Sequence, residues 1–244
     1  MKAFYIRHIH RVVPEDIDQD YHNILLHYSA YYSMLNIELQ GKFRLRLYHL
    51  LSILSFSSLE LPKVTREMRA VIGSSIIQIT FGLSNYLPTK FTNIVVKPHR
   101  YMYPGFGEPF LGHIDFDRSM IFFSWHDVQQ GYIYPYDAVN VALHEMAHVI
   151  EAEDGFDQIF NWFFKKIEWS KWAQLAFDKM HIIRSGNNQF LKDYGGINMK
   201  EMFAVCIETF FEQPEEFKKS LPEIYTTLAD LLNQDPALML QQSK

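Results

Sequence analysis

The most informative segment of the sequence is Val141-Ala142-Leu143-His144-Glu145-Met146-Ala147-His148-Val149-Ile150. It contains the pattern HExxH, in which two histidines stand four residues apart and a glutamate follows the first. Residues four apart on a helix lie one above the other on the same face, so His144 and His148 can bind one metal ion. Zinc suits such a pair, because it takes imidazole nitrogens and in catalytic sites keeps a position open for water. The motif therefore predicts a helix with two metal ligands and with Glu145 beside them as a general base.

The residues around this motif are almost all apolar, which indicates a buried helix. Two histidines and a carboxylate in a core are expected to have partners such as a metal ion, because uncompensated polar groups are costly to bury. The alternative is a surface helix in which the motif arises by chance, and the apolar surroundings argue against it. Asp137 can begin the helix as its N-cap, and the helix is expected to run to about Glu153.

A catalytic zinc site needs a third protein ligand. No third histidine follows at short range, because position 154 is Asp154 and the next histidine is His181. A glutamate on a later helix is the other source of a ligand. Glu201, Glu208 and Glu212 are spaced by seven and four residues along an otherwise apolar segment, so they fall on one stripe of a helix. An acidic stripe of this kind is usually a solvated face.

Glu201 also has a second interpretation. The segment Asn198-x-x-Glu201 is a good capping box, in which the glutamate bonds back to the backbone of the capping residue. In that role Glu201 would hold the start of a helix and would not face a metal ion. The residues alone therefore leave both roles open.

Composition and charge limit the class of protein. Of the 244 residues, 48% are apolar, 16% aromatic and 21% charged, which is typical of a folded globular protein. The 23 basic and 28 acidic side chains give a net charge of -5, so no broad positive field is available for nucleic acid or anionic lipid. Cys206 is the only cysteine, which excludes an intramolecular disulfide and a thiolate metal cluster. We therefore expect a cytoplasmic protein that binds neither nucleic acid nor membrane.

The apolar periodicity outlines helices and a small sheet. Residues 21–54 show helical spacing and are predicted to form two packed helices, and later helices are expected at 199–211 and 223–233. The segments predicted as strands are residues 59–61, 94–96 and 120–125. The longest uncharged stretch, residues 70–89, contains polar residues and a proline, so we interpret it as a buried helix and its exit, not as a membrane span.

The order of these elements predicts an α+β protein. Helices and strands fill residues 1–132, and an essentially helical part, residues 133–244, carries the motif. The strand at 120–125 lies just before the motif helix in the chain, and two roles are open for it. It is either an edge on which an extended peptide pairs through its backbone or a plain core strand.

Several segments beyond the motif are shared with one known family. They are Phe123-Ser124-Trp125, Asn140-Val141-Ala142-Leu143-His144-Glu145-Met146-Ala147-His148, Glu153-Asp154-Gly155, Tyr194-Gly195, Asn198, Glu201, Phe203-Ala204-Val205, Glu208, Pro214, Leu221-Pro222-Glu223-Ile224-Tyr225 and Gln234-Asp235-Pro236. In these segments the chain resembles the Mlc titration factor A family of zinc-dependent peptidases. There are departures, such as Met146 where the family usually has phenylalanine, but none falls on a candidate ligand.

The resemblance implies a single zincin-like peptidase domain over residues 1–244, mostly helical with a small mixed sheet and a gluzincin-type site. In that site His144, His148 and Glu201 bind Zn²⁺, Glu145 is the general base, and Tyr194 stabilises the oxyanion. Tyr194 and Glu201 stand seven residues apart here, as they do in the family.

The expected function is that of a zinc-dependent metallopeptidase that hydrolyses peptide bonds through zinc-activated water. The resemblance suggests an aminopeptidase acting on peptides or proteins. The alternative is a regulatory binding protein that sequesters a transcriptional repressor of sugar uptake, as the family name implies, with catalysis secondary. An inert scaffold would need neither Glu145 nor Tyr194, so their joint presence favours retained chemistry.

Overall fold

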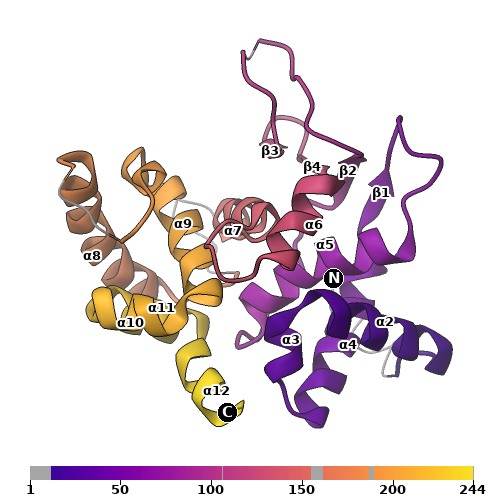
Figure 1. Cartoon of the computed structure of the whole chain (residues 1–244), viewed down its shortest axis with the longest axis horizontal. Coiled ribbons are helices and arrows are strands. Elements are labelled where there is room, and N and C mark those ends of the chain that lie inside the picture. The colour runs from indigo at the N-terminus through magenta and orange to yellow at the C-terminus, as the bar shows by residue number, and fades with distance from the viewer. Residues whose placement is uncertain (1–11, 106, 155–161, 187–189, 244) are drawn as a thin grey trace.

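The computed structural model describes residues 12–105, 107–154, 162–186 and 190–243 (Figure 1). This part of the chain is mostly helical with one small mixed sheet, which confirms the α+β prediction. The helices are α2 (Glu15–Tyr28), α3 (Ala30–Met34), α4 (Ile37–Leu51), α5 (Arg66–Thr80), α6 (Trp125–Ile133), α7 (Val141–Asp154), α8 (Lys166–Arg184), the 3-10 helix η1 (Asp193–Gly196), α9 (Met199–Glu212), α10 (Pro214–Ser220), α11 (Pro222–Leu232) and α12 (Pro236–Ser243).

The sheet has the strand order β1-β2-β4-β3. Its strands are β1 (Ser55–Ser57), β2 (Asn93–Lys97), β3 (Gly112–Asp115) and β4 (Met120–Ser124). β1, β2 and β4 run parallel, and β3 is antiparallel to β4. β4 therefore lies inside the sheet, so of the two roles left open for residues 120–125 the structure supports the core strand. The edge next to it is β3.

The hydrogen bonds of β3 leave part of its backbone facing outward. The amide of Ser124 donates to the carbonyl of Leu111 at 2.7 Å, which makes these two residues a hydrogen-bonded antiparallel pair. Hydrogen-bonded and non-bonded pairs alternate along an antiparallel ladder, so the N–H and C=O groups of Gly112 and Ile114 point away from β4. Among the described residues no hydrogen bond to these four groups is found, and they form a free edge.

β3 was not predicted, because its signal is a contact between distant segments and not a local pattern. The strand passes so close to α7 that a Cβ atom on Gly112 would lie 2.8 Å from Cγ of Glu145 and 2.9 Å from Cγ2 of Val141. Only glycine allows this approach. Gly112 is thus the residue that allows the sheet edge to lie against the motif helix.

α7 lies at the centre of the molecule, between the N-terminal helices on one side and α8 to α11 on the other (Figure 1). It packs against α5, α9 and β3. Most of its side chains are buried, and buried apolar residues from both sides of it belong to one continuous core. The prediction of a buried motif helix is confirmed. Among the helices of the described residues, none is long and apolar enough to cross a membrane.

Three details of the predicted elements are wrong. Residues 21–54 form three helices and not two, because a short helix, α3, is set off by its own N-cap, Ser29. Residues 59–61 form a turn in which Ser58 Oγ accepts the amide of Leu61 at 3.0 Å, and the nearby strand is β1. Asp137 does not begin α7. Asn140 does, since its side chain accepts the amide of Leu143 at 3.1 Å.

Glu153 ties the last turn of α7 to the segment that enters β2. Its carboxylate accepts hydrogen bonds from the amides of Thr89, Lys90 and Phe91 at 2.9, 2.5 and 2.8 Å, and from the Thr89 hydroxyl at 2.6 Å. The side chain is buried. One carboxylate thus accepts three backbone donors, of which the amide of Phe91 is buried and would otherwise lack an acceptor.

We predict that Glu153→Ala lowers the free energy of unfolding by about 2 kcal/mol, because the buried amide of Phe91 loses its acceptor. Urea unfolding followed by circular dichroism measures the change. Glu60→Ala is the control, since Glu60 pairs with Lys97 on the surface, and it should change stability by less than about 0.5 kcal/mol. Equal losses in the two variants would show that the Glu153 contacts do not stabilise the fold.

Candidate metal centre

α7 presents His144 and His148 on one face. Their ring centroids are 4.8 Å apart with an interplanar angle of 85°, and the two Nε2 atoms face each other at 3.2 Å. Both side chains are largely buried. The four-residue spacing places the two imidazoles at one point, as expected from the motif.

Glu201 reaches the same point from the first turn of α9. Asn198 is the N-cap of α9 and accepts the amides of Lys200 and Glu201 at 2.9 and 3.0 Å. Oε2 of Glu201 lies 3.2 Å from Nε2 of His144 and 3.5 Å from Nε2 of His148. Asn198 therefore caps the helix, while the Glu201 side chain turns to the histidines and not back to the cap.

These three atoms fit a divalent metal ion. Four ligands at about 2.1 Å around a tetrahedral ion are about 3.4 Å from one another. The observed separations of 3.2, 3.2 and 3.5 Å match this spacing. His144, His148 and Glu201 are a His-His-Glu group that could hold a metal ion, with the fourth position left to water or substrate.

The charges at the group are strongly coupled. Burial lowers the pKa of His144, but the hydrogen bonds to Glu201 and Glu208 outweigh it and raise the pKa to about 10. Burial raises the pKa of Glu201, but its hydrogen bonds to His144 and His148 outweigh it and lower the pKa to about 2. A nitrogen that binds a metal ion must be deprotonated. Binding of a metal ion at neutral pH would therefore release the proton from Nε2 of His144, the nitrogen that faces Glu201.

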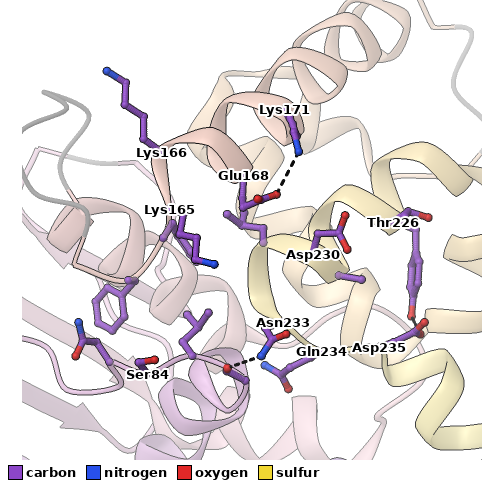
Figure 2. Close-up of a pocket in the computed structure, with 18 of the residues that line it drawn as sticks. Ser84, Lys165, Lys166, Glu168, Lys171, Thr226, Asp230, Asn233, Gln234 and Asp235 are labelled. Carbon is purple, nitrogen blue, oxygen red and sulfur yellow. Dashed lines mark hydrogen bonds and ion pairs between the residues drawn. The ribbon is translucent and has the colours of Figure 1, made fainter.

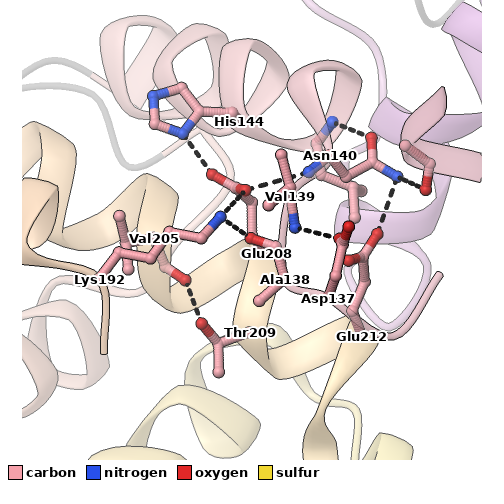
Figure 3. A network of polar contacts seen from close by, with 12 residues as sticks. Asp137, Ala138, Val139, Asn140, His144, Lys192, Val205, Glu208, Thr209 and Glu212 are labelled. Atoms are coloured by element: carbon pink, nitrogen blue, oxygen red, sulfur yellow. Dashed lines mark hydrogen bonds and ion pairs between the residues drawn. The ribbon is translucent and has the colours of Figure 1, made fainter. Parts of the chain in front are cut away.

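Glu208 is a residue of the site that sequence reasoning missed. The sequence analysis named it as part of an acidic stripe and of the family resemblance but gave it no role, yet it is 4% exposed and lies behind His144 (Figure 3). Oε1 of Glu208 is 2.5 Å from Nδ1 of His144. A carboxylate only accepts hydrogen bonds, so Nδ1 carries the proton and Nε2 is left to face the metal position. The signal was available in the sequence, because the rest of the helix is too apolar for its acidic stripe to be a solvated face.

Two further groups complete the environment of Glu208 (Figure 3). Its Oε2 accepts a hydrogen bond from Lys192 Nζ at 3.1 Å and one from the backbone amide of Asn140 at 3.1 Å. The side chain of Asn140 also donates to Glu212 Oε1 at 3.1 Å. The carboxylate of Glu208 is therefore held by the start of α7 and by a lysine, and its orientation is fixed from three directions.

Glu145 and Tyr194 lie at the same cleft, which has a volume of about 490 Å³. Glu145 is 8% exposed, and burial raises its pKa despite the nearby His144 and His148. The ring of Tyr194 is 5.9 Å from the ring of His144 and is 51% exposed. Partial burial, with the charges of Glu201 and Glu145, raises the pKa of Tyr194, so this hydroxyl stays protonated at neutral pH.

Other polar residues of the described chain do not join the metal group. His113 bonds to the Tyr101 hydroxyl at 2.7 Å, and Asp115 accepts the amide of Arg118 at 2.9 Å. A larger groove of about 1060 Å³ lies elsewhere, between residues 82–85, α8 and α11 (Figure 2). Several of its charges pair with each other, as Lys171 does with Glu168 at 3.8 Å. It shares no lining residue with the cleft at the histidines.

A helix-borne HExxH beside a glutamate from a second helix defines the class of protein as a metallopeptidase candidate. The comparison with known families agrees. The model of the family described as glucose-regulated metallo-peptidase M90 matches residues 5–232, and the chain belongs to this family, which is that of Mlc titration factor A. The resemblance predicted from the sequence is thereby confirmed at the level of the family.

The chain is also similar to the uncharacterized protein slr2042 of Synechocystis sp. The two are 23% identical over 181 residues, which are 68% of this chain and 66% of that protein. The chain thus spans just under two thirds of the relative's own length. The printed name of the relative assigns it no activity.

We predict that Glu208→Gln weakens zinc binding about 10- to 100-fold, because the amide no longer holds the Nδ1 proton of His144 as a carboxylate does. Competition with a chromogenic chelator measures the affinity. Glu212→Gln is the matched control one turn along α9. Burial raises the pKa of Glu212 to about 8, so its carboxyl is mainly neutral at pH 7 and the amide is a close replacement. If both variants bind zinc as the wild type does, Glu208 does not position His144.

Proposed function

We propose that the chain is a zinc-dependent metallopeptidase with a single zincin-like domain. The observation that carries the proposal is the triangle of Nε2 of His144, Nε2 of His148 and Oε2 of Glu201, whose sides match tetrahedral coordination. These three residues would hold the ion. When bound, zinc supplies Lewis acidity, which lowers the pKa of water and polarises a substrate carbonyl.

Glu145 is proposed as the general base. It follows the first histidine directly, so its carboxylate lines the cleft beside the metal position. A buried carboxyl with a raised pKa is suited to take a proton from water and to deliver it to the leaving amine, since both steps need a pKa close to the working pH.

Tyr194 is proposed as the donor that stabilises the oxyanion. Its ring lies against the first histidine, and its hydroxyl keeps its proton. A neutral hydroxyl can donate to the negative charge that develops on the carbonyl oxygen during attack. Tyr194 is half exposed and lines the cleft.

The free edge of β3 is proposed to bind the substrate backbone. The outward N–H and C=O groups of Gly112 and Ile114 can pair with an extended peptide, as edge strands do. Both residues line the cleft that holds Glu145. A peptide on this edge would therefore run past the general base. The pairing with an extended peptide that was considered for residues 120–125 is thus proposed for the neighbouring strand, β3.

Aminopeptidase activity is supported by the family resemblance, and the regulatory role is the second candidate. The groove between α8 and α11 shares no lining residue with the cleft, so a protein partner bound there would leave the cleft open. Hydrolysis of a panel of aminoacyl and internal peptide substrates, with and without chelator, tests the aminopeptidase activity. Glu145→Gln separates the two, because sequestration of a repressor does not require a general base.

We predict that Glu145→Gln binds zinc as tightly as the wild type but loses peptide hydrolysis by a factor of about 10³ or more, because no carboxylate remains to move the proton. Metal analysis and turnover on the same preparation measure both quantities. Glu215→Gln, on the exposed start of α10, is the control and should retain full turnover. Unchanged turnover of Glu145→Gln would remove Glu145 from the mechanism.

We predict that Tyr194→Phe lowers kcat about 100-fold with little change in KM, because the hydroxyl acts in the transition state and not in substrate binding. Steady-state kinetics on the best substrate of the panel measures the split. Tyr136→Phe is the matched control, since Tyr136 is exposed and does not line the cleft. A rise in KM of about the same factor, with kcat unchanged, would assign Tyr194 to substrate binding.

A further inference from the structure

The two histidines of α7 differ in what lies behind their rings. Nδ1 of His144 bonds to the carboxylate of Glu208 at 2.5 Å, which fixes this ring through the nitrogen that faces away from the metal position (Figure 3). Nδ1 of His148 is buried and has no hydrogen-bond partner among the described residues. A histidine that binds a metal ion through Nε2 carries its proton on Nδ1, and this N–H group almost always donates to an acceptor. The second imidazole therefore lacks the contact that the first one has.

An unpaired acceptor lies one turn further along the same helix. Oε1 of Glu151 is also buried without a hydrogen-bond partner in the part of the chain that the structure describes, and Glu151 is 4% exposed. A buried acceptor without a partner is costly, because it has lost its bonds to water and gained none in return. Two unpaired polar atoms, one that can donate and one that can accept, are thus buried three residues apart on α7.

The helix brings these two side chains together. His144, His148 and Glu151 are spaced by four and three residues, so they fall on one stripe of α7. Side chains three apart on a helix have Cβ atoms about 5–6 Å apart, a gap that a glutamate side chain can span. Long side chains on a helix also lean toward its N-terminus, over the residues three and four positions earlier. The side chain of Glu151 is thus expected to lean toward the ring of His148.

The surroundings of Glu151 agree with this placement. Burial raises the pKa of Glu151 to about 8, and the charges of Lys200 and Glu201 at the start of α9 also act on it. Glu201 is the residue that α9 brings to the two histidines. The carboxyl group of Glu151 therefore lies on the side of α7 that carries the metal group.

The other unpaired oxygens lie elsewhere. Among the described residues, the remaining buried side-chain oxygens without a partner are Oε1 of Gln78 and Oε2 of Glu212. Both residues line a separate cavity of about 90 Å³, which shares no lining residue with the cleft at the histidines. Glu151 is thus the unpaired side-chain acceptor that α7 itself offers to Nδ1 of His148.

We propose that Glu151 is the positioning residue of His148: with a metal ion on Nε2, the Nδ1–H group donates to Oε1 of Glu151. This inference rests on the proposed metallopeptidase function. It gives each histidine a carboxyl group of its own, Glu208 from α9 behind His144 and Glu151 from α7 behind His148. The bond needs no charge on Glu151, since a neutral carboxyl group still has an oxygen that accepts. Metal binding would thereby pair two atoms that are otherwise costly to bury.

The test compares zinc affinity with stability. Competition with a chromogenic chelator measures zinc affinity, and urea unfolding measures the stability of the zinc-free protein. Glu151→Leu removes the acceptor and fills the space with an apolar side chain, whereas Glu151→Gln is the conservative variant, because it keeps an oxygen that can accept. Gln78→Leu is the matched control, since Gln78 is also 4% exposed, also has an unpaired buried oxygen, and lies outside the cleft.

We expect Glu151→Leu to weaken zinc binding about 10- to 100-fold, as the loss of a partner behind a metal-binding histidine typically does. Glu151→Gln should lose less, and Gln78→Leu should bind zinc as the wild type does. The zinc-free Glu151→Leu protein should be at least as stable as the wild type, because leucine removes an unpaired buried acceptor. A purely structural role would lower stability and leave zinc affinity unchanged. Equal zinc affinity of Glu151→Leu and the wild type would overturn the proposal.

NMR of the zinc-loaded protein with ¹⁵N-labelled histidine observes the bond itself. In the wild type the Nδ1 proton of His148 should give a resolved signal that exchanges slowly with water. Glu151→Leu should shift this signal upfield and speed its exchange, and Gln78→Leu should leave it in place. A His148 signal that does not respond to Glu151→Leu would overturn the proposal.

Peptide hydrolysis by the wild type distinguishes this inference from the proposed function. If zinc affinity depends on Glu151 but no peptide is cleaved, the peptidase function fails and the positioning role stands. If peptides are cleaved but zinc affinity does not depend on Glu151, the positioning role fails and the peptidase function stands.

Discussion

The packing of α7 against α9 is the contact on which the metal centre depends, because each helix supplies ligands that the other lacks. α7 contributes His144 and His148, and α9 contributes Glu201 and, behind it, Glu208. Two acidic side chains on one helix would repel each other in a core if they stood alone. The histidine between them separates the two carboxylates and bonds to both. The apolar faces of the helices bring these groups together, and the polar contacts then fix their orientation.

The same contact extends to the start of α7. Asn140 begins α7, donates to Glu208 through its backbone and to Glu212 through its side chain. The left-handed turn at Ala138 lies just before it. The start of α7 is therefore fixed to the same carboxylate that holds His144. A change at Glu208 is expected to disturb the first ligand and the start of its helix together.

Local patterns were enough to predict the buried motif helix and the strands at 94–96 and 120–125, because their signals lie in consecutive residues. They were not enough for the free edge. β3 depends on Gly112. A glycine is needed at this position because the strand passes close to Glu145, which lies over thirty residues later in the chain. Glu208 was named but not recognised, since a helical stripe of acids has the same spacing whether it faces water or a histidine. The roles of Glu145, Tyr194 and Glu201 rest on the motif and the resemblance, to which the structure adds their proximity.

The pairing of Lys192 with Glu208 has a consequence for the kind of ion that the centre selects. With Glu145 ionised and both imidazoles neutral, the carboxylates of Glu145, Glu201 and Glu208 and the ammonium group of Lys192 leave a net charge of −2 at the cleft. A dication balances them, whereas a singly charged ion such as sodium leaves an uncompensated charge in a medium that screens it poorly. Lys192 therefore brings the net charge to the value that a divalent ion neutralises, although it is not one of the three residues that could hold the ion.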